Sequence, residues 1–119
     1  MTMASFDVTI QTPTMMQREG NVESLVAPGL DGLIGVMARH HPMVAAVGTG
    51  VLKLRRNRQE TYYVVGEGAM EVRGDVVTLL CDAVIPATGP ADAEDKAERY
   101  LRQVGQPPVL ADSVAATVR

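Results

Sequence analysis

The sequence has few aromatic residues, a single cysteine and no long apolar run. It contains no tryptophan, and aromatic residues make up 3% of its 119 positions, so side chains on which bases or sugars could stack are nearly absent. Cys81 is the only cysteine, which excludes an intrachain disulfide. Its place in the apolar run 76–81 predicts a buried thiol in a reducing compartment. The core must therefore be built from Val, Leu, Ile and seven Met residues.

No apolar stretch approaches the roughly 20 residues that span a bilayer, so we expect a chain that does not cross the membrane. Residues 1–10 lack the basic segment and the long apolar core of a secretory signal, which indicates a mature cytoplasmic protein. The net charge is −3, whereas neutralising nucleic-acid phosphates requires a cationic surface. We therefore expect protein partners and no nucleic acid.

Most of the chain has the pattern of short β-strands. From Phe6 to Ile10 apolar and polar residues alternate, as they do in a half-buried strand. Further strands are predicted over residues 21–27, 33–37, 43–47, 51–55, 61–65, 70–73 and 76–83, with connections at 56–60 and a two-residue turn at 74–75. Such spacing favours a mainly β fold, an antiparallel sandwich or barrel, which we assign to residues 1–87.

The character of the chain changes after Pro86, where residues 87–90 form a short linker. Apolar residues then recur at the spacing of a helix, at Ala93, Ala97, Tyr100, Leu101 and Val104. Asp92 is predicted to cap the N-terminus of this helix, and the pairs 95/99 and 98/102 should form ion pairs. Gly105 and the prolines at 107 and 108 end the helix. Residues 88–119 are assigned to a short helical tail, with one more marginal helical turn within 109–119.

No arrangement of residues predicts catalysis or a metal site. His40 and His41 are the only histidines, and adjacent residues do not converge easily on one metal ion. No serine has the context of a nucleophile elbow. The Gly-rich run 29–35 contains no lysine and opens no helix, so it fits neither the P-loop nor the dinucleotide-binding pattern. We expect no catalytic residue, no metal and no cofactor.

One basic cluster, comprising Lys53, Arg55, Arg56 and Arg58, falls at a predicted hairpin tip. It could contact an acidic partner or phosphates, but such tips are more often simply solvated. Two other functions stay open on these grounds. A free-standing β-sandwich adaptor or ligand-binding module would show a concave pocket, and a small hydrolase would require His40 beside a carboxylate and a nucleophile.

Longer motifs point to a family. Residues 27–35 read APGLDGLIG and residues 36–43 read VMARHHPM, which resembles the ATP synthase epsilon signature APG-x-DG-x-x-GVLPGHAPL. His40 and Pro42 fall on its His and its final Pro. The match continues in the family's order with GVLKL at 50–54, EGAMEV at 67–72 and VTLLCDA at 77–83. By this combination, which covers most of residues 6–85, the chain is identified as a member of the epsilon-subunit family of F-type ATP synthases.

The resemblance implies a non-catalytic central-stalk subunit that couples ion-driven rotation of the c-ring to ATP synthesis. It also implies an antiparallel two-sheet β-sandwich over residues 1–87, followed by the short helical tail. In this family the sandwich grips the gamma subunit and rests on the c-ring, and the beta subunit is a further candidate partner. The implied contact residues for the c-ring and gamma are Asp31, Gly32, Leu33, His40 and Pro42. The subunit would lie peripherally on the cytoplasmic face of the inner (plasma) membrane.

Three positions depart from the family pattern. Leu33 stands where relatives often have an acidic residue. Ala69 stands where a larger residue is common, so either the local packing differs or Met70 or Met37 fills the space. The Asp-x-x-Arg-Ala motif with which relatives bind ATP ends here in Lys96 and Ala97. Ala93 occupies the Asp position, which argues against nucleotide binding. Only eleven residues follow Pro108, which predicts a weak or absent inhibitory C-terminal arm.

Overall fold

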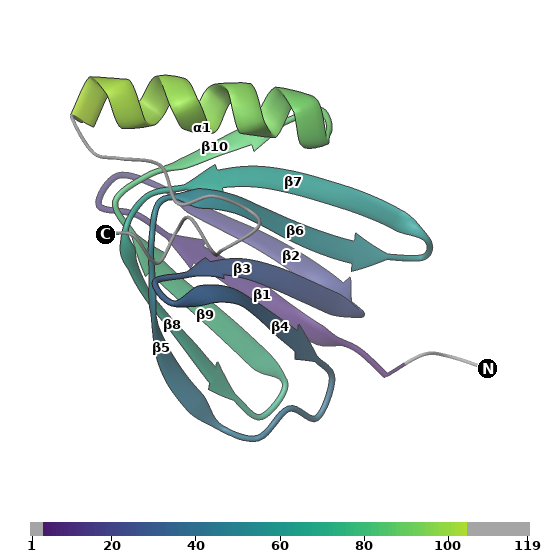
Figure 1. Ribbon diagram of the computed structural model, residues 1–119. Coiled ribbons are helices and arrows are strands. Elements are labelled where there is room, and N and C mark those ends of the chain that lie inside the picture. The colour runs from purple at the N-terminus through teal and green to yellow at the C-terminus, as the bar shows by residue number, and fades with distance from the viewer. Residues whose placement is uncertain (1–3, 105–119) are drawn as a thin grey trace.

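The computed structural model describes residues 4–104, which form strands followed by one helix (Figure 1). The strands are β1 (Phe6–Gln11), β2 (Met16–Val22), β3 (Ser24–Gly29), β4 (Gly32–Met37), β5 (Met43–Val47), β6 (Gly50–Arg56), β7 (Gln59–Val65), β8 (Gly68–Arg73), β9 (Val76–Cys81) and β10 (Val84–Ala87). The helix is α1 (Pro90–Val104). The predicted helix stop at 105–108 and the predicted turn within 109–119 lie outside the described residues.

The strands form one continuous sheet that curls into two facing layers (Figure 1). Its order is β10-β7-β6-β3-β5-β8-β9-β1-β2, and β4 pairs with β3 outside this path. β3 joins the layers, because its first half pairs with β6 while Gly29 at its end pairs with Val47 of β5. The predicted mainly β sandwich is thus confirmed. One pairing differs, since β1 runs parallel to β9, whereas the other pairs among the described strands are antiparallel.

Alternation along the strands directs apolar side chains into the space between the two layers. Ile10, Leu52, Met70 and Leu79 are completely buried there, and burying each such side chain contributes roughly 1.5–3 kcal/mol to folding. Cys81 is buried as predicted, its thiol donates to the carbonyl oxygen of Ala83, and burial raises its pKa. A core of this density gives a body that resists deformation.

Two strand boundaries differ from the sequence prediction. The single strand expected over 21–27 is two strands, β2 and β3, which are separated at Glu23. Just before this point β2 is irregular, since its register with β1 shifts and Asn21 has a positive φ of 56°. Residues 84–87, which lie between the strand predicted to end at 83 and the linker predicted over 87–90 and include its first residue, form β10. Its Pro86 is tolerated because β10 has a strand neighbour on one side only.

The helix begins earlier than predicted, which changes the role of Asp92. The N–H of Ala93 already bonds the carbonyl oxygen of Gly89 at 2.9 Å, so Gly89 is the capping residue and Asp92 lies within the first turn. Its carboxylate accepts a hydrogen bond from the N–H of Thr88 at 2.9 Å, reaching back as in a capping box. That bond lowers the pKa of Asp92, and the neighbouring Lys96 adds to the effect.

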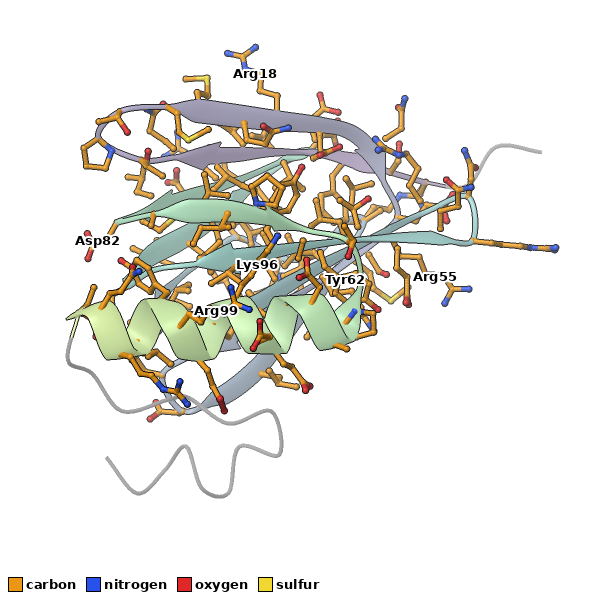
Figure 2. The ribbon with its side chains drawn as sticks, turned by 90° about the horizontal axis from the view of Figure 1, so that it is seen from above. Arg18, Arg55, Tyr62, Asp82, Lys96 and Arg99 are labelled. Carbon is orange, nitrogen blue, oxygen red and sulfur yellow. The ribbon has the colours of Figure 1, made fainter. Side chains whose placement is uncertain are left out.

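The helix lies over the outer surface of the layer that contains β6, β7 and β10 (Figure 2). The small side chains of Ala93 and Ala97 pack on Val64, which lets the helix approach the sheet closely. Lys96 donates to the carbonyl oxygen of Pro86 at 2.9 Å and pairs with Asp92 at 3.0 Å. The two predicted ion pairs, 95/99 and 98/102, are both present. The outer surface of this layer is therefore already covered by the chain itself.

Candidate functional site

The histidines do not form a reactive centre. The rings of His40 and His41 stack with centroids 4.4 Å apart, and Nδ1 of His40 lies 2.7 Å from the carbonyl oxygen of His41. Within residues 4–104, no group of three or more His, Cys, Asp or Glu side chains is placed to hold a metal ion. Over the same residues, no helix is long and apolar enough to cross a membrane. The geometry of this loop thus offers the hydrolase interpretation no support.

The five residues predicted to contact the c-ring and gamma fall at two places. Asp31 and Gly32 form the tip of the β3–β4 hairpin, where Gly32 has a φ of 128° that favours glycine, and Leu33 follows with 51% of its surface exposed. His40 and Pro42 follow the opposite end of β4. At about 3.3 Å per residue, the two groups lie roughly 16 Å apart along the strand. The structure brings the first three together and separates them from the other two.

The outer surface of the second layer is not covered by the helix. One row of side chains crosses it in register from β5 to β2, and we call it the apolar row: Ala46, Ala69, Leu80, Gln11 and Met16. Leu80 is 55% exposed and Met16 is 50% exposed, so large apolar side chains meet solvent beside two small alanines. Exposed apolar side chains of this size are typical of the centre of a protein interface.

A more polar row runs beside the apolar row, along Val44, Glu71, Thr78, Thr9 and Arg18. Val44 is strongly exposed, while Glu71 pairs with Arg73 at 3.4 Å. Figure 2 shows Arg18 projecting away from the sheet. An apolar centre beside a polar margin is the usual arrangement of a docking surface, and this surface is the candidate functional site.

Ala69, which stands where a larger residue is common in the family, lies in this surface. Of the two alternatives, the structure agrees with a difference in local packing. Ala69 faces outward, so there is no interior space for Met37 or Met70 to fill. Met70 is buried in the core on the opposite face of β8, and Met37 is 64% exposed on β4. Ala69 instead places a small side chain beside Leu80 in the apolar row.

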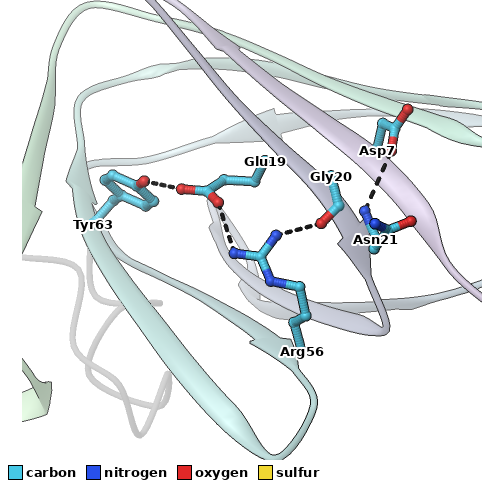
Figure 3. Close-up of polar contacts among 6 residues, drawn as sticks. All are labelled: Asp7, Glu19, Gly20, Asn21, Arg56 and Tyr63. Carbon is cyan, nitrogen blue, oxygen red and sulfur yellow. Dashed lines mark hydrogen bonds and ion pairs between the residues drawn. The ribbon is translucent and has the colours of Figure 1, made fainter.

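Two residues of the basic cluster, Lys53 and Arg56, form ion pairs with different carboxylates. Arg56 pairs with Glu19 of β2 at 3.1 Å and also donates to the carbonyl oxygen of Gly20 (Figure 3). The hydroxyl of Tyr63 donates to the same Glu19 carboxylate. Lys53 pairs instead with Glu60 at 3.6 Å. We call Glu19, Arg56 and Tyr63 the polar bridge, because it joins β2, at one end of the sheet order, to β6 and β7 of the facing layer. The sequence offered no signal for this bridge, since its members are 37 and 44 positions apart.

One face of the helix includes the position that corresponds to the first residue of the nucleotide motif. Ala93, at the position of the motif's Asp, has none of its surface exposed and packs on Val64. A carboxylate there would be driven into an apolar contact without a partner. In this arrangement, the face of the helix that carries the motif's first position is used to attach the helix to the sheet.

Comparison with known proteins identifies the family. Residues 5–87 match the family model described as ATP synthase, Delta/Epsilon chain, beta-sandwich domain. The chain is 32% identical over 106 residues to the ATP synthase epsilon chain of Caldicellulosiruptor bescii, covering 85% of this chain and 77% of that one. It is 33% identical over 114 residues to the epsilon chain of Moorella thermoacetica, covering 91% and 84%. The chain therefore belongs to the ATP synthase delta/epsilon chain family, as its motifs predicted.

The fold is shared with a solved structure. A chain in the cryo-EM structure of the mitochondrial ATP synthase of Euglena gracilis, which comprises OSCP, F1 and the c-ring, superposes with a TM-score of 0.66 at 21% identity. The similarity covers 95% of this chain and 73% of that one. At this level of identity, the comparison supports the fold.

Proposed function

We propose that this chain is a non-catalytic subunit of the central stalk of an F-type ATP synthase. It binds the gamma subunit and the c-ring and couples ion-driven rotation of the ring to ATP synthesis. It lies peripherally, on the cytoplasmic face of the membrane that holds the ring. The observation that carries the proposal is the family match over residues 5–87, which spans the whole sandwich.

The outer surface around the apolar row supports a docking role. α1 covers the other layer, so the exposed Leu80 and Met16 have no cover within the described residues. We assign the gamma subunit to this surface. The c-ring contact is assigned to the β3–β4 tip with Asp31, Gly32 and Leu33, and His40 and Pro42 contact gamma or the ring separately.

The construction of the sandwich supports transmission of torque. A densely packed core resists compression, and the polar bridge joins strands that are not neighbours in the sheet. A catalytic role is not part of the proposal, because the subunit's task is to hold two partners in a fixed relation.

A weak or absent inhibitory arm completes the proposal. Its support is the burial of Ala93 against the sheet, where it packs on Val64. A helix whose apolar face is used in this way is not readily available to another subunit.

The test is retention of the full chain by the gamma subunit of the same organism in a pull-down assay. Leu80→Glu places a charge in the centre of the apolar row and should reduce retention at least about tenfold, as expected when an interface residue that contributes more than 1.4 kcal/mol is lost. Val104→Glu is the matched control, because Val104 is 43% exposed at the far end of α1. Equal retention of both variants would contradict the assigned surface, and failure of the unchanged chain to bind gamma would contradict the function.

A further inference from the structure

Three strands of the described sheet have a strand neighbour on one side only: β2, β4 and β10. Exposed sheet edges promote unwanted pairing, so proteins usually protect them with charges, proline or a covering element. β2 carries Arg18 and Glu19, and the latter belongs to the polar bridge. β10 contains Pro86, whose carbonyl oxygen is occupied by Lys96 of the covering helix. β4 reads GLIGVM and has neither charge nor proline.

The pairing of β3 shows which backbone groups of β4 are open. The carbonyl oxygen of Pro28 accepts a hydrogen bond from Gly48, so the even-numbered residues of β3 direct their polar groups away from β4. Backbone groups alternate between the two edges of a strand. In the register that pairs Ala27 with Ile34, the backbone N–H and C=O of Ile34 therefore bond to β3. The backbone N–H and C=O groups of Leu33 and Gly35 point to the open edge.

The surface beside this edge is accessible. An added Cβ at Gly35 would meet no atom within 4 Å. Leu33 is 51% exposed and Met37 is 64% exposed on either side of this glycine. The outward side of β4 thus has a bulky apolar group, a gap and a second bulky group in sequence.

We propose that the free chain pairs with a second copy of itself through the open edge of β4. An antiparallel arrangement centred on Ile34 sets Leu33 of each copy opposite Gly35 of the other, and each such pair exchanges both of its backbone hydrogen bonds. The arrangement is isologous, so it closes at two copies and leaves no further edge to extend.

Side chains and charges are complementary in this register. Leu33 of one copy fills the gap above Gly35 of the other and reaches Met37 on the diagonal. The two Ile34 side chains meet on the inner face. Asp31 at one end of the strand comes to the same end as Arg39 of the second copy, which follows the opposite end of β4, so opposite charges approach at both ends of the pair.

Sedimentation equilibrium of the full chain over a range of concentrations tests the proposal. The unchanged chain should show a reversible monomer–dimer equilibrium. Gly35→Pro removes an N–H donor on the open edge without touching the β3–β4 ladder, a position where proline is tolerated. Leu33→Lys places a charge in the paired edge. Each should raise the dimer dissociation constant at least about tenfold, the effect of losing roughly 1.4 kcal/mol.

Val44→Lys is the matched control, because Val44 is an exposed strand residue on β5, away from this edge, and it should leave the dissociation constant unchanged. Circular dichroism checks that each variant folds. If Gly35→Pro does not fold, Leu33→Lys alone tests the proposal. A chain that is monomeric at every concentration overturns the proposal. So does a Val44→Lys variant whose dimer dissociation constant rises as much as those of the β4 variants. If the chain is monomeric and Gly35→Pro abolishes its binding to the gamma subunit, the proposal is also wrong, because β4 would then pair with a strand of gamma. Dimerisation does not depend on gamma, so it can fail while the proposed function stands.

Discussion

Arg56 of β6 lies 3.1 Å from the carboxylate of Glu19 on β2, and the contact joins two strands that are not neighbours in the sheet. Glu19 is the more buried partner, with 13% of its side chain exposed against 37% for Arg56. It also accepts a hydrogen bond from Tyr63 (Figure 3). A carboxylate this sheltered is stable because it has these two donors. The polar bridge thus holds the two layers together at the margin where the sheet itself does not close.

Removing the carboxylate should open this margin. Glu19→Ala leaves Arg56 and Tyr63 without their shared acceptor, and we expect a loss of about 1–3 kcal/mol in the free energy of unfolding. Urea unfolding monitored by circular dichroism measures it. Glu71→Ala serves as the control, because its pair with Arg73 is strongly exposed and should contribute less than about 1 kcal/mol. Comparable losses in the two variants would show that the bridge is not structural.

Tyr63 makes stability depend on alkaline pH. Burial, and then the hydrogen bond to Glu19, raise the pKa of Tyr63 above its ordinary value of 10.0. The folded state therefore keeps the proton when the unfolded chain releases it. The contribution to stability is complete below the unfolded pKa and is lost as pH rises toward the folded pKa.

Tyr63→Phe should accordingly lower stability at about pH 8, by roughly 1–3 kcal/mol for the lost bond to a charged group, yet flatten the decline above about pH 10. Urea unfolding at several pH values measures both effects. Tyr62→Phe is the comparison, since the pKa of Tyr62 is raised mainly through its exposed hydrogen bond to Glu60. An unchanged alkaline slope in Tyr63→Phe would contradict the assignment.

Gly68 permits the close approach of β8 to β9. An added Cβ would lie 2.7 Å from Cα of Cys81 and closer still to the carbonyl oxygen of Leu80, so backbone would have to move. Gly68→Ala should lower the unfolding free energy by about 1–3 kcal/mol. Gly35→Ala is matched chemically, and since no atom lies within 4 Å of its added Cβ, it should change stability by less than about 0.5 kcal/mol. Thermal unfolding of both variants measures these changes in stability, and equal losses would contradict the role given to Gly68.

The attachment of α1 to the sheet should leave ATP hydrolysis largely unrestrained. Adding this subunit to the catalytic core of its own ATP synthase is expected to change the hydrolysis rate little, because Ala93 and Ala97 already attach α1 to the sheet. The measurement is the steady-state hydrolysis rate with and without the subunit. Strong suppression that is relieved by deleting residues 109–119 would refute the prediction.

Sequence reasoning found the elements whose side chains alternate clearly. Phe6, Val8 and Ile10 are buried on one face as their spacing requires, and the ordered motifs identified the family. β2 escaped notice because MQREGNV is an edge strand with little apolar surface to bury. The polar bridge and the apolar row could not be predicted either. Both depend on strand register, which joins residues that are distant in sequence.

The parallel pairing of β1 with β9 has a consequence for biosynthesis. Val8 of the first strand lies beside Val77, so the N-terminal strand waits for most of the chain before it can take its place between β2 and β9. Contacts of such long sequence separation slow folding. Residues up to the end of β9 must therefore leave the ribosome before β1 can pair on both of its sides, so the core of the sandwich closes late in synthesis.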